Sequence, residues 1–188
     1  MRILREFYSK NTISPGYLLL SPLLFIFSLI YYVAVSAIKF LYKLEVLKTY
    51  RSRLVTISVG NITMGGSGKT PFVEYLALYL RSKNARPAVI LRGYKKPLKD
   101  NGIGLSEYYQ SGDEAAFLKE NLRGKAGVFS SIDRAGQARI IENQGGFDTI
   151  MLDDGFQHWR IKRDLDIVVI NSVNPFGNGA ILPLGVLR

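Results

Sequence analysis

The sequence predicts an α/β domain with a mostly parallel sheet and helices on both faces, preceded by an N-terminal hydrophobic membrane helix. Three observations lead to this prediction. Short strand-like apolar segments alternate with helix-like segments, which is the pattern of parallel α/β sheets. A glycine-rich turn stands between the first of these strands and the helix after it, and a long uncharged run lies near the N-terminus. We therefore expect an anchor region over residues 1–53 and an α/β domain over residues 54–188.

The N-terminal region combines this hydrophobic run with basic flanks. Residues 11–38 contain no charge, and the 22 residues from Tyr17 to Ile38 are nearly all apolar, about 33 Å as a helix. The net charge of +10 is concentrated here, since residues 1–56 carry eight Lys and Arg against two Glu. Basic residues beside an apolar run favour a membrane surface over nucleic acid. The sequence leaves open whether the helix spans the membrane, lies in one leaflet or is a buried helix of a soluble protein.

Residues 63–70 form the glycine-rich turn and predict a phosphate-binding loop. They follow the apolar run 54–59 and precede the helix-compatible segment 71–82. Strand, glycine-rich turn, Lys-Thr and helix is the order of a P-loop, so we expect a fold like that of the P-loop NTPases. The candidate nucleotide-binding residues are Thr63, Met64, Gly65, Gly66, Ser67, Gly68, Lys69 and Thr70.

Each residue type in this loop suits an anion. The glycines let backbone N–H groups turn inward, and the helix N-terminus adds donors and the positive end of a dipole. Lys69 is expected at the β- and γ-phosphates of ATP, and the Thr70 hydroxyl at Mg²⁺. Thr63 departs from the general pattern, which has glycine there. The alternative is a glycine-rich surface turn that happens to precede a lysine.

The rest of the chain continues the alternation of strands and helices. Helices are expected over residues 112–122 and 134–143, and strands over residues 87–91, 128–131, 148–152 and 166–170. Ligands of such sheets gather at the carboxyl ends of the strands. Asp153 and Asp154 follow the strand at 148–152, and carboxylates are the ligands that Mg²⁺ prefers. The alternative for this pair is a solvated turn. The chain has no cysteine, which excludes disulfides and thiolate metal sites.

Two further candidates keep two interpretations each. Asp113 and Glu114 open a predicted helix, so they are either helix-capping acids or functional carboxylates. His158 is the single histidine of the chain, and taken alone it is more typical of a structural residue than of a functional one.

Together these motifs resemble the tetraacyldisaccharide 4′-kinase family of lipid A biosynthesis. The resemblance runs from end to end of the chain, and Asp-Asp-Gly-Phe-Gln-His at 153–158 is its most specific part. The other matching pieces are Val-Gly-Asn at 59–61 leading into the phosphate loop, Arg-Gly-Tyr at 92–94, Gly-Asp-Glu at 112–114 and Leu-Pro-Leu-Gly-Val-Leu-Arg at 182–188.

The resemblance implies transfer of the ATP γ-phosphate to the 4′-hydroxyl of an acylated glucosamine disaccharide 1-phosphate. The implied location is the bacterial inner membrane, with the catalytic domain facing the cytoplasm and no obligate protein partner. Lys69 would handle phosphates, Asp113 would be the base for the sugar hydroxyl, and the substrate would contact Arg92, Tyr94, Gln157 and His158. The ligands of Mg²⁺ would be Thr70, Glu114, Asp153 and Asp154.

The sequence departs from the family pattern at three places. Leu91 stands where the family usually has serine, Val186 where it usually has proline, and family members continue beyond Arg188 into a further lobe. The chain is therefore expected to be an N-terminal portion. Rival interpretations are a membrane-associated P-loop ATPase and a remnant that binds nucleotide and membrane without activity. A GTPase is excluded, because its guanine-reading Asn-Lys-x-Asp motif is absent from the sequence.

Overall fold

The computed structural model describes residues 15–65, 68–93 and 115–188, and it divides into two compact units. The first unit contains Met1–Lys48, Asn61–Ser67 and Val169–Arg188, and the second contains Thr49–Gly60 and Gly68–Val168. The units are not continuous in sequence, because two short segments group with the N-terminal helix. The predicted domain boundary after residue 53 stays a prediction.

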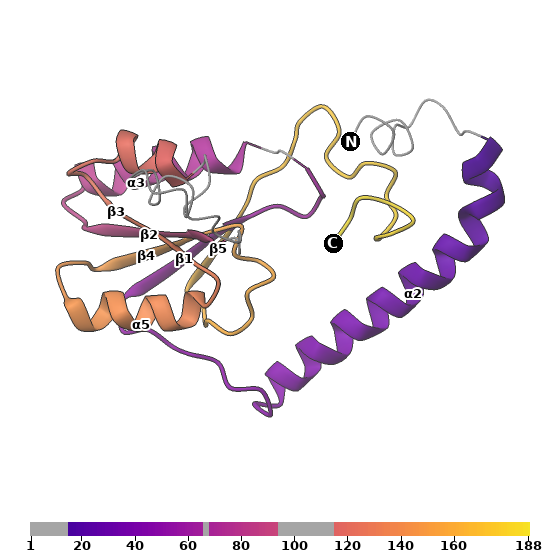
Figure 1. The fold of residues 1–188 in the computed structure, drawn as a ribbon, viewed down its shortest axis with the longest axis horizontal. Coiled ribbons are helices and arrows are strands. Elements are labelled where there is room, and N and C mark those ends of the chain that lie inside the picture. Colours follow the sequence, from indigo (N-terminus) through magenta and orange to yellow (C-terminus); the bar gives the residue numbers. More distant parts are fainter. Residues whose placement is uncertain (1–14, 66–67, 94–114) are drawn as a thin grey trace, which may run out of the picture. The chain divides into compact units, whose positions relative to one another are not determined.

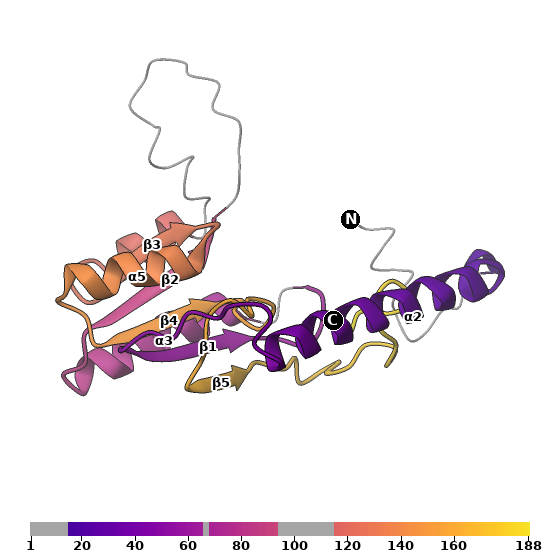
Figure 2. The ribbon, with the colours of Figure 1, turned by 90° about the horizontal axis from the view of Figure 1, so that it is seen from below.

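The second unit is built on a parallel sheet of five strands. The strands are β1 (Val55–Gly60), β2 (Pro87–Arg92), β3 (Gly127–Ser131), β4 (Thr149–Asp153) and β5 (Leu165–Val168). They lie in the order β3-β2-β4-β1-β5, and each neighbouring pair is parallel (Figure 2). This arrangement confirms the predicted parallel α/β fold.

Helices cover both faces of the sheet, as predicted. Figure 1 shows α3 (Lys69–Ser82) on one face and α5 (Arg134–Gln144) on the other. Successive residues of a strand point to opposite faces of the sheet. When helices cover both faces, nearly all residues of the strand are therefore apolar. The α5 face buries one alternate set, Ala88, Ile90, Ile150 and Leu152, against Ala135, Ala138 and Ile141 of α5. The other set, Val89, Leu91 and Met151, is equally buried and so faces the α3 side.

Two element ends differ from their predicted positions by two residues, and the other ends of these strands and helices differ by at most one. Helix α3 begins at Lys69 and not at Pro71. Gly68 caps it in a left-handed conformation, and proline is tolerated in a first helical turn, so the helix includes the Lys-Thr pair. Strand β5 ends at Val168 and not at Ile170, because Val168 pairs with Gly60, where its partner β1 ends.

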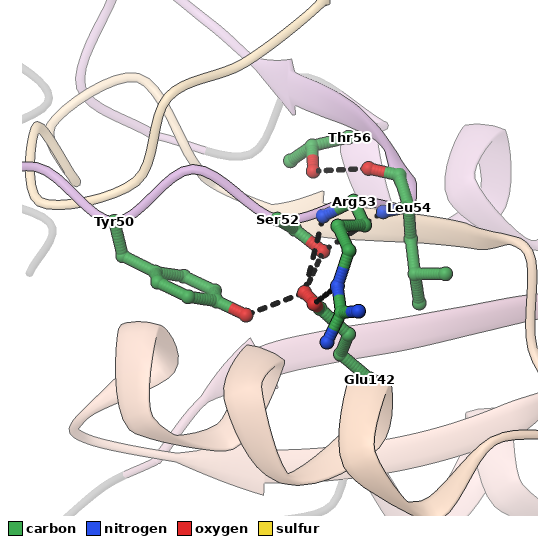
Figure 3. A network of polar contacts seen from close by, with 6 residues as sticks. All are labelled: Tyr50, Ser52, Arg53, Leu54, Thr56 and Glu142. Atoms are coloured by element: carbon green, nitrogen blue, oxygen red, sulfur yellow. Dashed lines mark hydrogen bonds and ion pairs between the residues drawn. The ribbon is translucent and has the colours of Figure 1, made fainter.

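A polar network attaches the segment before β1 to α5 (Figure 3). The Glu142 carboxylate accepts hydrogen bonds from the Tyr50 hydroxyl at 2.5 Å, the Ser52 hydroxyl at 2.8 Å and the Arg53 backbone N–H at 3.1 Å. The Arg53 guanidinium pairs with the same carboxylate. These donors favour the charged carboxylate and lower the pKa of Glu142 to about 2.

The first unit contains α2 (Pro15–Lys43), a helix of 29 residues. Leu19–Lys43 is long and apolar enough to cross a membrane, with a mean hydropathy of 2.1, and it is the one such helix among the described residues. Its large apolar side chains are mostly exposed, including Phe25, Ile26, Leu29 and Ile30. An apolar helix with this much exposed surface is not the core helix of a soluble domain, so membrane contact is the better explanation.

Candidate active site

The carboxyl ends of the parallel strands bring the predicted polar residues to one edge of the sheet. Gly60, Arg92 and Asp153 are the last residues of β1, β2 and β4. Because the β1–β4 register pairs Val59 with Asp153, the strand that leads to the phosphate loop ends beside the Asp-Asp pair. This is the edge at which ligands of open α/β sheets bind.

Lys69 and Asp154 meet at this edge. The Lys69 Nζ lies 3.7 Å from Asp154 Oδ1, and both side chains are largely buried, with 15% and 23% of their surface exposed. Lys69 is the first residue of α3, behind Gly68, whose φ of 75° is in the left-handed region that favours glycine. No side chain caps this helix start in the described structure, which leaves backbone N–H groups for an anion.

The Asp-Asp turn itself has an unusual backbone. Asp153 is buried at the end of β4, and Asp154 follows with a φ of 53°, a region that few residues other than glycine adopt. Gly155 has no room for a side chain, because an added Cβ would lie 2.8 Å from Leu152 Cβ. Gly60 similarly lies against the Phe156 ring. Close packing therefore sets the direction of the turn that carries both carboxylates.

Two arginines that the sequence analysis did not identify hold this turn. Arg134 is 4% exposed, and its Nη1 donates to the backbone carbonyls of Asp153 at 2.8 Å and Asp154 at 3.1 Å. The Arg163 Nη1 donates to the Gly155 carbonyl at 3.1 Å and pairs with Asp166 through its Nε. One signal was available for Arg134, because a basic residue in the first turn of a helix opposes the helix dipole.

A pocket of about 430 Å³ opens beside the turn. Its lining residues are Arg92, Gly93, Ile132, Arg134, Asp154, Gln157 and His158. The structure thus brings together Arg92, Gln157 and His158, which were predicted as substrate contacts, with Asp154. Two arginines beside a carboxylate suit a polar, phosphorylated ligand with a bound cation.

His158 is half-buried in this pocket and uncharged at neutral pH. Burial and the charges of Arg134 and Arg160 lower its pKa to about 4. Its Nε2 is buried, and no hydrogen-bond partner for it lies within the described part of the chain. A neutral imidazole nitrogen in this position is suited to exchanging a hydrogen bond with a ligand hydroxyl.

The predicted magnesium ligands are only partly described. Asp153 ends β4, Asp154 follows it, and Thr70 is the second residue of α3. Residues 15–65, 68–93 and 115–188 contain no cluster of three or more His, Cys, Asp or Glu side chains that would hold a metal alone. The donor set nevertheless fits Mg²⁺, which is usually held by one or two carboxylates together with the phosphates of a nucleotide.

Several predicted residues lie outside the described structure. These are Gly66 and Ser67 of the phosphate loop, Tyr94, and the pair Asp113 and Glu114. The choice between helix cap and functional carboxylate for Asp113 therefore stays open.

Comparison with known proteins now adds to this geometry. Residues 20–188 match the family described as "Tetraacyldisaccharide-1-P 4'-kinase". The chain belongs to this family. It is 38% identical to the tetraacyldisaccharide 4'-kinase of Halothermothrix orenii over 100% of the chain and 52% of that relative. It is 36% identical to a probable mitochondrial tetraacyldisaccharide 4'-kinase of Arabidopsis thaliana, over 90% of the chain and 46% of that relative.

The fold agrees with a solved structure of the same family. The crystal structure of "apo" form LpxK from Aquifex aeolicus in complex with ATP matches with a TM-score of 0.72 and 31% identity. The match covers 90% of this chain and 54% of the LpxK chain. The chain thus spans about half the length of the tetraacyldisaccharide 4'-kinases that it matches.

Proposed function

We propose that this chain carries the nucleotide-binding and membrane-binding part of an ATP-dependent tetraacyldisaccharide 4'-kinase. The reaction would transfer the γ-phosphate of ATP to the 4'-hydroxyl of a tetraacyldisaccharide 1-phosphate. The observation that carries the proposal is the Lys69–Asp154 pair, 3.7 Å apart. It joins the lysine of a phosphate loop to a carboxylate at the adjacent strand end, in a chain of this family.

In this reaction the chain's own residues position and neutralise charge. The α3 N-terminus and Lys69 would bind the β- and γ-phosphates, and Asp154 lies 3.7 Å from the Lys69 ammonium. Arg134 keeps the Asp-Asp turn in place through two backbone carbonyls. Transfer through a loose transition state needs this positioning more than it needs covalent chemistry.

Magnesium would be held by Asp153, Asp154 and Thr70, with Glu114 as a further candidate. When bound, it would neutralise charge on the phosphates. Asp113 is the candidate base that accepts the proton of the sugar hydroxyl, while His158, Gln157, Arg92 and Tyr94 are candidate contacts to the acceptor.

The membrane location follows from the substrate and from α2. Acyl chains keep the acceptor in the bilayer, so the enzyme has to work at its surface. We favour insertion of α2 into one leaflet over a full crossing. Ser28, near the middle of α2, donates to the Ile181 carbonyl at 2.9 Å and accepts from the Leu184 N–H at 3.0 Å. In a crossing helix this contact would place irregular backbone near the bilayer centre, where lipid-exposed irregular backbone is not tolerated.

The basic residues near α2 and the need for ATP indicate which membrane the chain binds and on which side. Basic residues in the last turns of α2 and just after it, including Lys39, Lys43 and Lys48, suit an anionic leaflet. We propose the inner bacterial membrane with the α/β domain on the cytoplasmic side, where ATP is available.

A transfer assay tests the proposal. The protein in detergent micelles receives γ-labelled ATP, Mg²⁺ and tetraacyldisaccharide 1-phosphate, and the label is located on the product. Lys69→Ala should weaken Mg·ATP binding or turnover at least about tenfold, since about 1.4 kcal/mol corresponds to a factor of ten. Lys83→Ala, at the other end of α3, is the matched control. Binding of ATP without transfer would support a nucleotide-binding portion only, and unchanged ATP affinity in Lys69→Ala would count against the phosphate-loop assignment.

A further inference from the structure

The last residues of the chain pair with the start of the phosphate loop. The Met64 N–H donates to the Val186 carbonyl at 2.7 Å, and the Arg188 N–H donates to the Ile62 carbonyl at 3.0 Å. Thr63 and Leu187 form an antiparallel bridge between them. Residues 62–64 are therefore held in a short two-stranded ladder directly before the glycines.

A buried amide makes a second link between the same two segments. Asn61 is 2% exposed, and its Nδ2 donates to the Thr63 carbonyl at 2.6 Å and, more weakly, to the Gly65 carbonyl at 3.4 Å. Its Oδ1 accepts from Arg188 Nη2 at 2.6 Å. The C=O and N–H of a planar trans peptide point in opposite directions. The Thr63 carbonyl and the Met64 N–H belong to one peptide, so Asn61 holds that peptide from one side while the Val186 carbonyl holds it from the other.

The same C-terminal segment is fixed to the membrane helix. Ser28 of α2 binds the backbone of Ile181 and Leu184, as described above. Ser28 is 8% exposed, whereas its neighbours Phe27 and Leu29 are at least half exposed. A buried hydroxyl in the middle of an exposed apolar helix is thus satisfied by this segment.

The segment between these contacts is itself internally bonded. The Asn178 side chain accepts from the Ala180 N–H at 3.2 Å and donates to the Leu184 carbonyl at 3.0 Å. The Leu187 N–H donates to the Ala180 carbonyl at 3.1 Å. At Gly185 an added side chain would collide with the Ala180 carbonyl. A displacement at one end of such a segment is therefore passed on to the other end.

We propose that residues 180–188 form a brace through which α2 positions the phosphate loop, with Asn61 and Arg188 as positioning residues for the nucleotide. The inference rests on the proposed nucleotide binding at this loop. Its consequence is that the contact of Ser28 with residues 181 and 184 is coupled to the affinity of the phosphate loop for Mg·ATP, although Ser28 lies outside that loop. Coupling of this kind is reciprocal, so bound nucleotide also stabilises the Ser28 contact.

Four variants of the 188-residue chain in micelles test the brace. Ser28→Ala and Arg188→Gln should each raise the Kd for Mg·ATP by about fivefold or more, the lower end of typical coupling. Ser28→Thr keeps a hydroxyl and should restore the affinity to within about twofold. Ser36→Ala is the control, about two turns further along α2. The Ser36 hydroxyl makes no hydrogen bond to residues 180–188 in the described structure, so its removal should leave the Kd unchanged.

Hydrogen exchange provides a readout that does not depend on nucleotide. In the absence of ATP, Ser28→Ala should speed exchange of the Met64 and Arg188 amides, which are held in the ladder, without changing the β4 amides. If these two amides exchange at the wild-type rate in Ser28→Ala, the brace is overturned. If Lys69→Ala abolishes ATP binding while Ser28→Ala and Arg188→Gln bind normally, the inference fails and the proposed function stands. If the two amides respond but Lys69→Ala binds ATP like the wild type, the proposed function fails and the ladder contact stands.

Discussion

The buried guanidinium of Arg134 donates a 2.8 Å hydrogen bond to the backbone carbonyl of Asp153, and so joins the first turn of α5 to the end of β4. The same nitrogen reaches the Asp154 carbonyl at 3.1 Å. A cation at the start of a helix opposes the helix dipole, so its position needs compensation. The two carbonyls provide it, and the turn that carries both carboxylates gains a fixed position.

The first prediction concerns this arginine. Arg134→Met keeps the length of the side chain but leaves buried carbonyls without their donor. We expect the free energy of unfolding to fall by about 1–3 kcal/mol, measured by urea denaturation. Arg134→Lys should recover only part of this, because an ammonium lacks the planar donor fork. Arg160→Lys is the control, since the Arg160 side chain is 59% exposed and its change should stay within about 0.5 kcal/mol.

A second readout of Arg134→Met separates charge from packing. The positive charge of Arg134 helps to lower the pKa of His158, and His158 is the only histidine in the chain. Its imidazole signals in an NMR titration are therefore unambiguous. The pKa should rise from about 4 in Arg134→Met. An unchanged titration would mean that burial and the other nearby arginines keep His158 neutral without Arg134.

The sequence was sufficient to predict the parts of the site that depend on local chemistry. The glycine run and the Lys-Thr pair identified the phosphate loop. The Asp-Asp pair after an apolar run identified the carboxylates of the site. Their approach to each other followed from a general rule, because the carboxyl ends of parallel strands share one edge. The meeting of Lys69 with Asp154 is the concrete result.

Contacts between distant residues were not predictable in this way. Folding brings Arg134 to Asp153, and likewise Arg188 to Asn61. No local sequence pattern pairs an arginine with a particular carbonyl. The position of β1 between β4 and β5 is similarly absent from the local pattern, since β2 and β3 are the one pair of consecutive strands in the described sheet that are also sheet neighbours. Ser28 looked like an ordinary small residue of an apolar helix until its partners at 181 and 184 were known.

The next prediction is a pH dependence set by Glu142. Its pKa is about 2 in the folded protein against an ordinary value of 4.5, with the Tyr50 and Arg53 hydrogen bonds as the largest causes. As the pH falls, the Glu142 carboxylate is therefore protonated near pH 4.5 in the unfolded chain but only near pH 2 in the folded protein. The stabilisation by Glu142 is complete above the unfolded pKa and is lost as the pH falls through this window.

Glu142→Gln should accordingly be less stable than the wild type at neutral pH, and the difference should shrink as the pH falls below about 4.5. Thermal melts in a pH series measure it. Tyr50→Phe removes the hydroxyl donor, so on its own it should bring the pKa of Glu142 in the folded protein closer to 4.5. Combined with Glu142→Gln, it should have no pH-dependent effect on stability. A wild-type-to-Glu142→Gln difference that is constant from neutral pH down to pH 3 would contradict this account.

Membrane attachment gives a further prediction. Deleting residues 1–40 removes most of α2, and we expect the remaining chain to be released from vesicles in a sedimentation assay, because α2 is the one long apolar helix of the described structure. The deletion also removes Ser28, so a point variant is needed beside it. Phe27→Lys keeps Ser28 and places a charge on the exposed apolar surface, at a cost of about 3 kcal/mol in the bilayer centre and less near the interface. Continued sedimentation of both variants would place the anchor elsewhere in the chain.

The last prediction concerns Asp113, which lies just before the helical residues 115–121. Its two interpretations predict different losses. A helix cap replaced by a weaker residue costs roughly 1 kcal/mol of stability and leaves chemistry nearly intact. A base that accepts the proton of the sugar hydroxyl contributes typically 10²–10⁴-fold to the rate.

Asp113→Asn distinguishes these interpretations, because asparagine caps a helix about as well as aspartate but cannot take up a proton. We expect the variant to melt near the wild-type temperature, to bind Mg·ATP, and to lose phosphoryl transfer by at least about 100-fold. Where the 188-residue chain alone does not transfer phosphate, the same substitution is assayed in a fusion with the remaining half of a full-length relative. Transfer at the wild-type rate would make Asp113 a cap. The proton acceptor would then have to be sought at Asp153 and Asp154, whose carboxylates the buried turn already holds at the strand edge.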